Sequence, residues 1–375
     1  MGGCYNRGKA AKRIAKTKGD DMTKMTGIER IMKALKREEP DTVPHTELLI
    51  EQNIMDEILP GASYDDFVEH MDLDAVFVFD KLSAWKFDTV DASKRIKRDQ
   101  WGGLIRFSDM AALGISVGTA FKSENDVDLE SYVVPDPDED WRYDRLRQLV
   151  ERFKGDRAII AQVYDGFNII HESILTHFEF FSAMISNPDL ILQLNEIVAN
   201  YNLRYIKNCI EVGADVIFVS GDYAMTHGPM VSRAHTSRFL TPMLKRMVET
   251  AHSLNRPIMK HSDGNIYKIL DLMVETGIDG LHPIDVIAGM DIAKVKAEYG
   301  DRICLMGNVS VGWTLCSGSE EDVRQEVRDC IKKAGVGGGY ICSSSNIIHS
   351  GVKPENYVAM VKAIREYGKY PLELD

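Results

Sequence analysis

Residues 215–264 carry the pattern that decides the fold: DVIFVSGDYAMTHGPMVSRAHTSRFLTPMLKRMVETAHSLNRPIMKHSDG. An apolar run (215–222) is followed by a stretch with helical character (233–254) and then by a second apolar run (256–264). Continuous, rather than alternating, apolar runs are typical of parallel strands that are buried on both faces. The intervening helix supplies the crossover that parallel strands require. The segment therefore predicts a βαβ unit.

The same unit recurs along the chain. Six further apolar runs rich in Val, Ile and Phe lie at 42–49, 74–80, 157–165, 279–285, 302–308 and 339–346. Helices are expected from Thr26 and at 141–154, 187–212, 265–277, 319–334 and 354–367. Eight strand-then-helix units predict an α/β fold, a single (β/α)8 TIM barrel over residues 22–375. The glycine run 335–340 precedes a strand instead of following one, which indicates a turn and not a phosphate-binding loop.

One stretch interrupts the rhythm. Residues 81–156, between the second and third predicted strands, include DQWGGLIRFSD and the proline-bearing VVPDPDEDW. We interpret them as an insertion, a hairpin and loop over the barrel mouth that leads into helix 141–154. Such long segments in compact domains are usually functional or mobile.

Composition narrows the function classes. The net charge of −12 argues against general nucleic-acid binding, which needs a positive surface. No apolar run is long enough to span a membrane. The six cysteines form no CxxC pair, and we expect reduced thiols and a cytoplasmic location. Residues 1–21 are basic and poor in large apolar side chains, which predicts a disordered leader; a docking arm for an acidic partner is the alternative.

Polar side chains gather at the predicted strand ends, where the active site of such a barrel is built. They are His45, Glu47, Asp80, Tyr164, Asp165, Asp222, His261, Asp263, His282, Asn308 and Asn346. Each histidine has an alternative as a buried group bonded to a backbone carbonyl, and Asp222 as a helix N-cap.

His261 and Asp263 have a further property. Residues two apart in an extended segment share a face, so both side chains can bind one metal ion or one polar substrate group. Two ligands alone are weak evidence, because metal sites normally need three or four. Cys316 and Cys342 are candidate thiolate ligands, with inert core thiols as the alternative.

Several segments together resemble the uroporphyrinogen decarboxylase superfamily. They are TGIERIMKALKREEPDTVP near the start, GADVIFVSGDYA, PIMKHSDGN, the GN of LMGNVS, and GGGYICSSSNIIHSGVKPEN near the end. They occur in the family's order between about residues 26 and 367. The resemblance implies the same (β/α)8 barrel that the strand pattern predicts.

The resemblance also helps to distinguish the decarboxylases of this superfamily from its methyltransferases. Decarboxylases of the family carry an arginine-rich loop after the first strand, whereas this chain has PHTELLIEQN (44–53) there; Asp222 matches their pyrrole-binding aspartate. Corrinoid-dependent methyltransferases that act on thiols hold zinc through a His-x-Cys pair and a later Cys. This chain has His261-Ser262-Asp263 at the pair and Ser345 or Asn346 at the later position. The segments HSDGN and SSSNIIHSGVKPEN look most like aromatic O-demethylase methyltransferases.

That branch implies a methyltransferase that moves a methyl group from a methoxylated aromatic compound to the corrinoid of a separate protein. The chain lacks the DxHxxG signature of corrinoid domains, so the cofactor is expected on a partner. We expect Asp222, His261 and Asp263 to be catalytic, with His261 and Asp263 as ligands if zinc is present. The other eight strand-end residues are expected to bind substrate. Alternatives are a decarboxylase, a methyltransferase using another donor or a thiol acceptor, and a non-catalytic binding barrel. Homodimer formation is left open.

Overall fold

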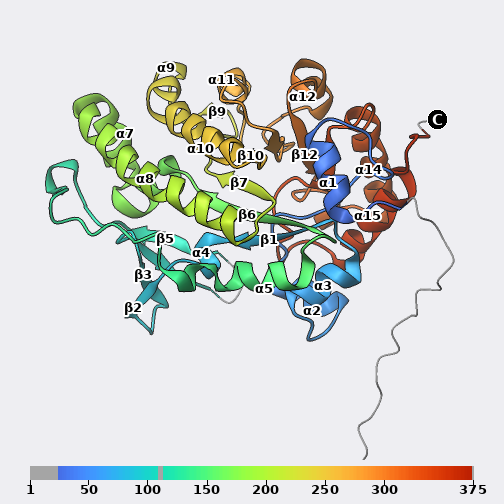
Figure 1. Cartoon of the computed structure of the whole chain (residues 1–375), viewed down its shortest axis with the longest axis horizontal. Helices are drawn as coiled ribbons and strands as arrows, with labels where there is room; N and C mark the ends of the chain where they lie inside the picture. Colours follow the sequence, from blue (N-terminus) through green and yellow to red (C-terminus); the bar gives the residue numbers. More distant parts are fainter. Residues whose placement is uncertain (1–23, 109–112, 374–375) are drawn as a thin grey trace, which may run out of the picture.

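The computed structural model describes residues 24–108 and 113–373, and its core is a curled sheet of seven parallel strands. Figure 1 shows the sheet with helices arranged around it. In spatial order the strands are β1 (Ala75–Phe79), β6 (Ala158–Tyr164), β7 (Val216–Ser220), β10 (Ile258–His261), β11 (Gly280–His282), β12 (Cys304–Val309) and β13 (Tyr340–Ser344). Six of them lie within runs predicted from the sequence, and β12 extends one residue beyond its run, 302–308. The fold is therefore α/β and TIM-barrel-like.

The strands are buried on both faces, as their continuous apolar runs predicted. Every residue of β1, β7 and β12 is buried. Alternate side chains such as Phe77, Phe218 and Met259 form one cluster inside the curl of the sheet. The intervening side chains, such as Val78 and Val219, pack in a second and larger cluster with the helices. This two-sided core holds the strand ends in a fixed register.

The first predicted strand, 42–49, is not a strand, and this corrects the sequence prediction. Segment 42–50 makes only isolated bridges, of Thr42 with Lys369, His45 with Cys342 of β13, and Ile50 with Ile348. Its other side meets the start of β1, where the Asp74 N–H donates to the His45 carbonyl over 2.8 Å. Pro44 has no N–H, and the His45 N–H is taken by the Asp74 carboxylate, so a regular ladder cannot continue. The segment occupies the eighth place around the curl without strand geometry.

Most of the predicted helices are present, two predicted ranges are altered, and several helices were not predicted. The predicted ranges contain α1 (Gly27–Leu35), α5 (Asp144–Phe153), α8 (Pro188–Val212), α14 (Glu320–Ala334) and α15 (Pro354–Tyr367). The additions include α2 (Gln52–Ile58), α3 (Tyr64–Met71), α7 (His177–Ser186) and α12 (Ile292–Tyr299). The range 265–277 contains only α11 (Leu270–Val274), and 233–254 is divided into α9 (Arg233–His235), a π-helical turn and α10 (Thr241–Ser253). Three successive glycines, 337–339, have φ between 68° and 78°, so run 335–340 is the predicted turn.

The chain between β1 and β6 forms a separate antiparallel sheet. Its strands are β2 (Phe87–Asp91), β3 (Ile96–Asp99), β4 (Leu104–Arg106) and β5 (Ile115–Gly118). The sheet is tied to the turn that follows β6: the Ser173 hydroxyl donates to the Asp99 carboxylate over 2.7 Å, and the Ser116 hydroxyl donates to the Glu172 carbonyl over 2.7 Å. These bonds anchor it beside the carboxyl end of β6.

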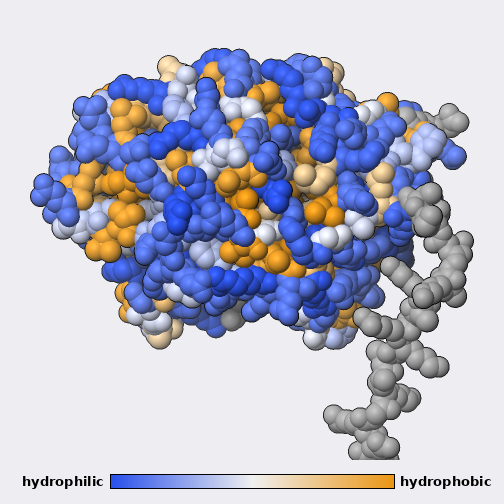
Figure 2. All heavy atoms as spheres, in the orientation of Figure 1, coloured by the Kyte–Doolittle hydropathy of each residue, from blue (hydrophilic) through white to orange (hydrophobic). Residues whose placement is uncertain are grey.

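The surface agrees with the composition. Figure 2 shows hydrophilic side chains over most of one face, with apolar ones scattered between them. Among the residues that the structure describes, no helix is both long enough and apolar enough to cross a membrane. The predicted leader, residues 1–21, lies outside the described residues.

Candidate functional site

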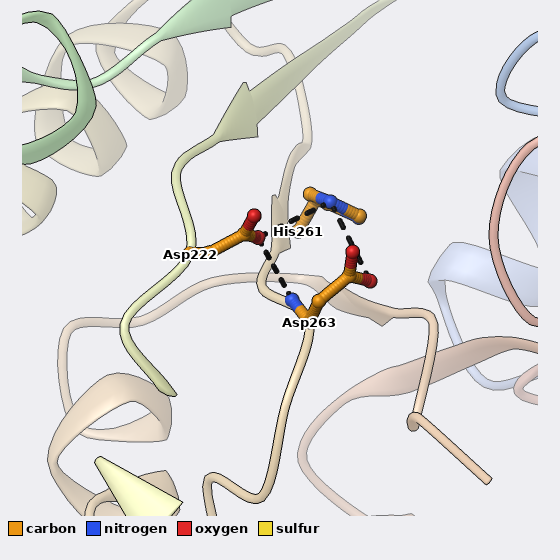
Figure 3. Close-up of side chains that lie close together, drawn as sticks. All are labelled: Asp222, His261 and Asp263. Carbon is orange, nitrogen blue, oxygen red and sulfur yellow. Dashed lines mark hydrogen bonds and ion pairs between the residues drawn. The ribbon is translucent and has the colours of Figure 1, made fainter. Parts of the chain in front are cut away.

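Three predicted side chains converge at the carboxyl ends of β7 and β10. Asp222 follows β7 by two residues, His261 ends β10, and Asp263 comes two residues later (Figure 3). The His261 Nε2 atom lies 3.4 Å from Asp222 Oδ1 and 3.8 Å from Asp263 Oδ1. Parallel pairing of His261 with Ser220 brings the two strand ends side by side. Asp222 is not a helix N-cap, because Ser232 caps the next helix.

Hydrogen bonds hold the two carboxylates in place. The Asp263 N–H donates to Asp222 Oδ1 over 2.9 Å, and Asn346 Nδ2 donates to Asp263 Oδ2 over 2.6 Å. The structure thereby brings one predicted substrate-binding residue, Asn346, to the cluster. The other Asp263 oxygen, Oδ1, is buried without a hydrogen-bond partner among the described residues. This oxygen lies 3.8 Å from His261 Nε2, and both atoms can serve as metal ligands.

The histidine of the cluster is buried, whereas its two carboxylates are partly exposed to solvent. The His261 side chain is 10% exposed, whereas those of Asp222 and Asp263 are 39% and 30% exposed. Burial raises the pKa of Asp263 to about 6; the nearby His261 opposes this rise, and the Asp222 and Asp285 carboxylates add to it. Near neutral pH, Asp263 is therefore a carboxyl group that can either hold a proton or accept one.

His282, the end of β11, supports His261 from inside the curl. Their Nδ1 atoms lie 2.8 Å apart, so one of them carries a proton and the other accepts it. Burial lowers the pKa of His282 well below its usual value, with His261 adding to the effect, so His282 is neutral. When His261 donates from Nδ1, its Nε2 lone pair faces the two carboxylates. In that tautomer Nε2 can bind a metal ion, and in the other tautomer His261 can donate from Nε2 to the carboxylates.

The donor set fits a divalent metal ion. The ligand atoms of Asp222, His261 and Asp263 all lie within 4.8 Å of one another, and no other such group occurs in the described part of the chain. Three protein ligands are the number found in catalytic zinc sites, which leave a further position for water or substrate. A metal held by these residues would act as a Lewis acid. Neither candidate thiol belongs to this group: Cys342 is fully buried, and the half-buried Cys316 donates to the Val311 carbonyl.

Two predicted residues, His45 and Glu47, lie together where segment 42–50 packs against β13. Glu47 accepts hydrogen bonds from the Ser344 hydroxyl, the Ser344 N–H and His45 Nε2, the last over 2.9 Å. Glu47 is 1% exposed and His45 is 5% exposed. The pair therefore joins segment 42–50 to β13 and does not contact the Asp222 cluster.

The predicted residues after β1 and β6 serve other contacts. Asp80 accepts the N–H groups of Lys81 and Tyr164, and burial raises its pKa to about 7. Asp165 caps the short helix after β6 and binds Lys260 over 2.8 Å. Tyr164 packs edge-on against Trp85, and burial raises its pKa.

Asn308 also lies apart from the cluster. Its amide donates to the Ile284 carbonyl over 2.9 Å, and it accepts from the Cys330 thiol of α14. It therefore faces the helix layer.

Sequence reasoning missed two charged residues next to the cluster. Lys260 is fully buried, and its ammonium also donates to the Gly221 carbonyl over 2.8 Å, one residue before Asp222. Asp285 accepts the Gly264 N–H over 3.0 Å and so fixes the loop that carries Asp263. Each residue had a signal in the sequence. Lys260 is a lysine inside the apolar run PIMKH, and Asp285 is the last residue of the predicted run 279–285.

Comparisons with known proteins place this site in a family. The family model for uroporphyrinogen decarboxylase (URO-D) matches residues 107–367. A uroporphyrinogen decarboxylase of Alkalilimnicola ehrlichii is 24% identical over 250 residues, covering 64% of this chain and 66% of the relative. One of Nitrosococcus oceani is 29% identical over 187 residues, covering 49% and 50%. The chain thus spans between half and about two thirds of the length of these curated relatives.

A solved structure supports the fold. A methyltransferase from Methanosarcina mazei superposes with a TM-score of 0.70 at 20% identity, covering 92% of this chain and 99% of that one. The family model covers most of the chain, including both strands that carry the Asp222 cluster. The chain belongs to the uroporphyrinogen decarboxylase family.

Proposed function

We propose that the protein is a corrinoid-dependent methyltransferase, the O-demethylase component that takes a methyl group from a small methoxylated aromatic compound. The observation that carries the proposal is the Asp222–His261–Asp263 cluster, which joins an open ligand position to a carboxyl group with a pKa of about 6. The fold shared with the Methanosarcina mazei methyltransferase adds support.

The chemistry assigns a limited task to this chain. The reduced corrinoid of a partner protein would supply the nucleophile that accepts the methyl group. The carbon–oxygen bond of the ether breaks, and its electron pair stays on the oxygen as a phenolate. The chain must stabilise that oxygen. Asp263 does so by donating a proton, or the cluster does so by holding a Lewis acid against it. His261 orients the donor, with His282 behind it.

The charges of the described residues favour an uncharged or weakly charged donor. Segment 44–53 has no arginine, and its buried acidic residues are Glu47 and Glu51. The three members of the cluster include two carboxylates, which would repel a polyacid. A porphyrinogen with many carboxylates therefore lacks counter-charges here.

The partner in this proposal is a corrinoid protein that docks over the strand ends. The sheet β2–β5 is bonded beside the carboxyl end of β6, so residues 81–156 are available as part of the docking rim. If the purified chain alone binds cobalamin tightly and turns over without a partner, this part of the proposal is wrong.

A decarboxylase is the second candidate, because the curated relatives are named uroporphyrinogen decarboxylase and Asp222 matches the family's pyrrole-binding aspartate. One experiment separates the two. The protein is incubated with a reduced corrinoid protein and a methoxylated phenol, and in parallel with uroporphyrinogen. We expect the methylcobalamin absorbance and free phenol in the first reaction, and neither with His261→Ala. Coproporphyrinogen formed at a useful rate in the second would refute the proposal.

A further inference from the structure

An apolar cavity of about 280 Å³ lies between residues 48–55 and the free edge of β1. Among the described residues, segment 42–50 hydrogen-bonds to this strand only near its start, at Asp74 and Ala75, and the Phe77 N–H donates to Tyr64 instead of to that segment. Its apolar walls are formed by buried side chains, those of Leu48, Ile50, Met55, Phe77 and Phe79. The exposed Leu82 of α4 (Asp80–Ser83) lies at its opening, at the carboxyl end of β1.

The cavity contains one available hydrogen-bond donor. The Tyr64 hydroxyl accepts the Phe77 N–H over 3.1 Å, and its own proton has no acceptor among the described residues. Burial raises the pKa of Tyr64 to about 12, so the hydroxyl keeps that proton at neutral pH. Arg145 is the one charged residue in the wall, and both of its terminal nitrogens are bonded to Asp65. The cavity therefore offers a donor but no uncompensated charge.

The volume of the cavity and the residues that line it indicate which kind of ligand it can bind. Apolar cavities of roughly 150 Å³ stay dry and bind benzene. A cavity of about 280 Å³ therefore has room for one aromatic ring with a small substituent. Apolar walls bind such a ring through the area removed from water. A charged ligand would have to lose its hydration without gaining a counter-charge.

The cavity is distinct from the Asp222 cluster. It lies at β1, whereas the cluster lies at β7 and β10, with β6 between them in the sheet. Ring contacts connect the two: the Phe77 ring of the cavity wall meets the Phe218 ring edge-on at 5.1 Å, and the Phe218 and His261 rings are 6.0 Å apart. We propose that this cavity is a second ligand site, which binds one uncharged monocyclic aromatic molecule with its acceptor group on the Tyr64 hydroxyl.

The test uses the full chain with labelled leucine and isoleucine methyl groups, observed by NMR during titration with anisole and with toluene. We expect saturable shifts of the Leu48 and Ile50 methyl signals with both ligands. Tyr64→Phe should weaken anisole about fivefold, the loss of one net hydrogen bond, and leave toluene unchanged. Leu82→Trp should abolish both sets of shifts by filling the opening.

The matched control is Leu192→Trp on α8, because Leu192 is 39% exposed, compared with 45% for Leu82, and does not line the cavity. This control should bind both ligands as the unmodified chain does. Shifts confined to residues around His261, or binding that survives Leu82→Trp in a folded protein, would overturn the proposal. No step of the test depends on turnover, so it holds whether or not the protein transfers methyl groups.

Discussion

Replacing Asp263 by Asn should stabilise the protein while removing the carboxyl group of the site. The rise of the Asp263 pKa from 3.8 to about 6 means that the folded protein disfavours the charged carboxylate. One pKa unit corresponds to about 1.4 kcal/mol, so the cost is up to about 3 kcal/mol. The side chain is 30% exposed, which reduces this figure, and we expect a gain of about 1–3 kcal/mol for Asp263→Asn at neutral pH.

The gain has a defined pH dependence. Between about pH 4 and pH 6 the folded chain binds more protons at Asp263 than the unfolded chain does, so this group makes stability fall as the pH rises. The advantage of Asp263→Asn should therefore be absent near pH 4, grow up to about pH 6 and stay constant above it. Urea unfolding at pH 5, 6 and 8 in a chelator measures this difference.

Two comparisons make the result decisive. Asp301→Asn, at an exposed turn residue, removes one negative charge without touching the cluster and should show no such trend. Adding Zn²⁺ should stabilise the unmodified chain more than Asp263→Asn, because ligand binding to the folded state adds stability. A variant that is less stable than the unmodified chain at pH 8, or a difference that is independent of pH, would refute the reasoning.

Three other substitutions test the surroundings of the site. His261→Ala should lower methyl transfer at least about tenfold in a protein that still unfolds cooperatively, and unchanged turnover would remove the residue from the mechanism. His282→Phe should weaken Zn²⁺ binding about 10- to 100-fold in calorimetric titration, because His261 loses the partner at Nδ1. Lys260→Met leaves the buried Asp165 carboxylate without its partner and should cost about 3–5 kcal/mol in urea unfolding; a cost below 1 kcal/mol would contradict a buried ion pair.

The structural features that depend on a local sequence pattern could be predicted from the sequence. The apolar runs located β1, β7 and β10, because strands buried on both faces must be apolar throughout. The i, i+2 rule correctly placed His261 and Asp263 on one side, and the shared end of parallel strands brought Asp222 to them.

The remaining features depend on partners distant in the chain. Segment 42–49 has the composition of a strand, but Asp74 takes the His45 N–H, which no local pattern reveals. Asn346 reaches Asp263 from 83 residues away. Lys260 was hidden in an apolar run because its charge is matched by Asp165, 95 residues earlier. Asn308 faces α14, a direction that depends on strand alternation and not on residue type.

During synthesis, the curled sheet can close only when segment 42–50 meets β13. Glu47 receives its hydrogen bonds from Ser344, 297 residues later in the chain, and His45 bridges to Cys342. A ribosome therefore exposes the first segment long before its partner strand exists. Until then, the side of segment 42–50 that later meets β13, with the Glu47 carboxylate on it, has no partner, so the nascent chain is open to aggregation there.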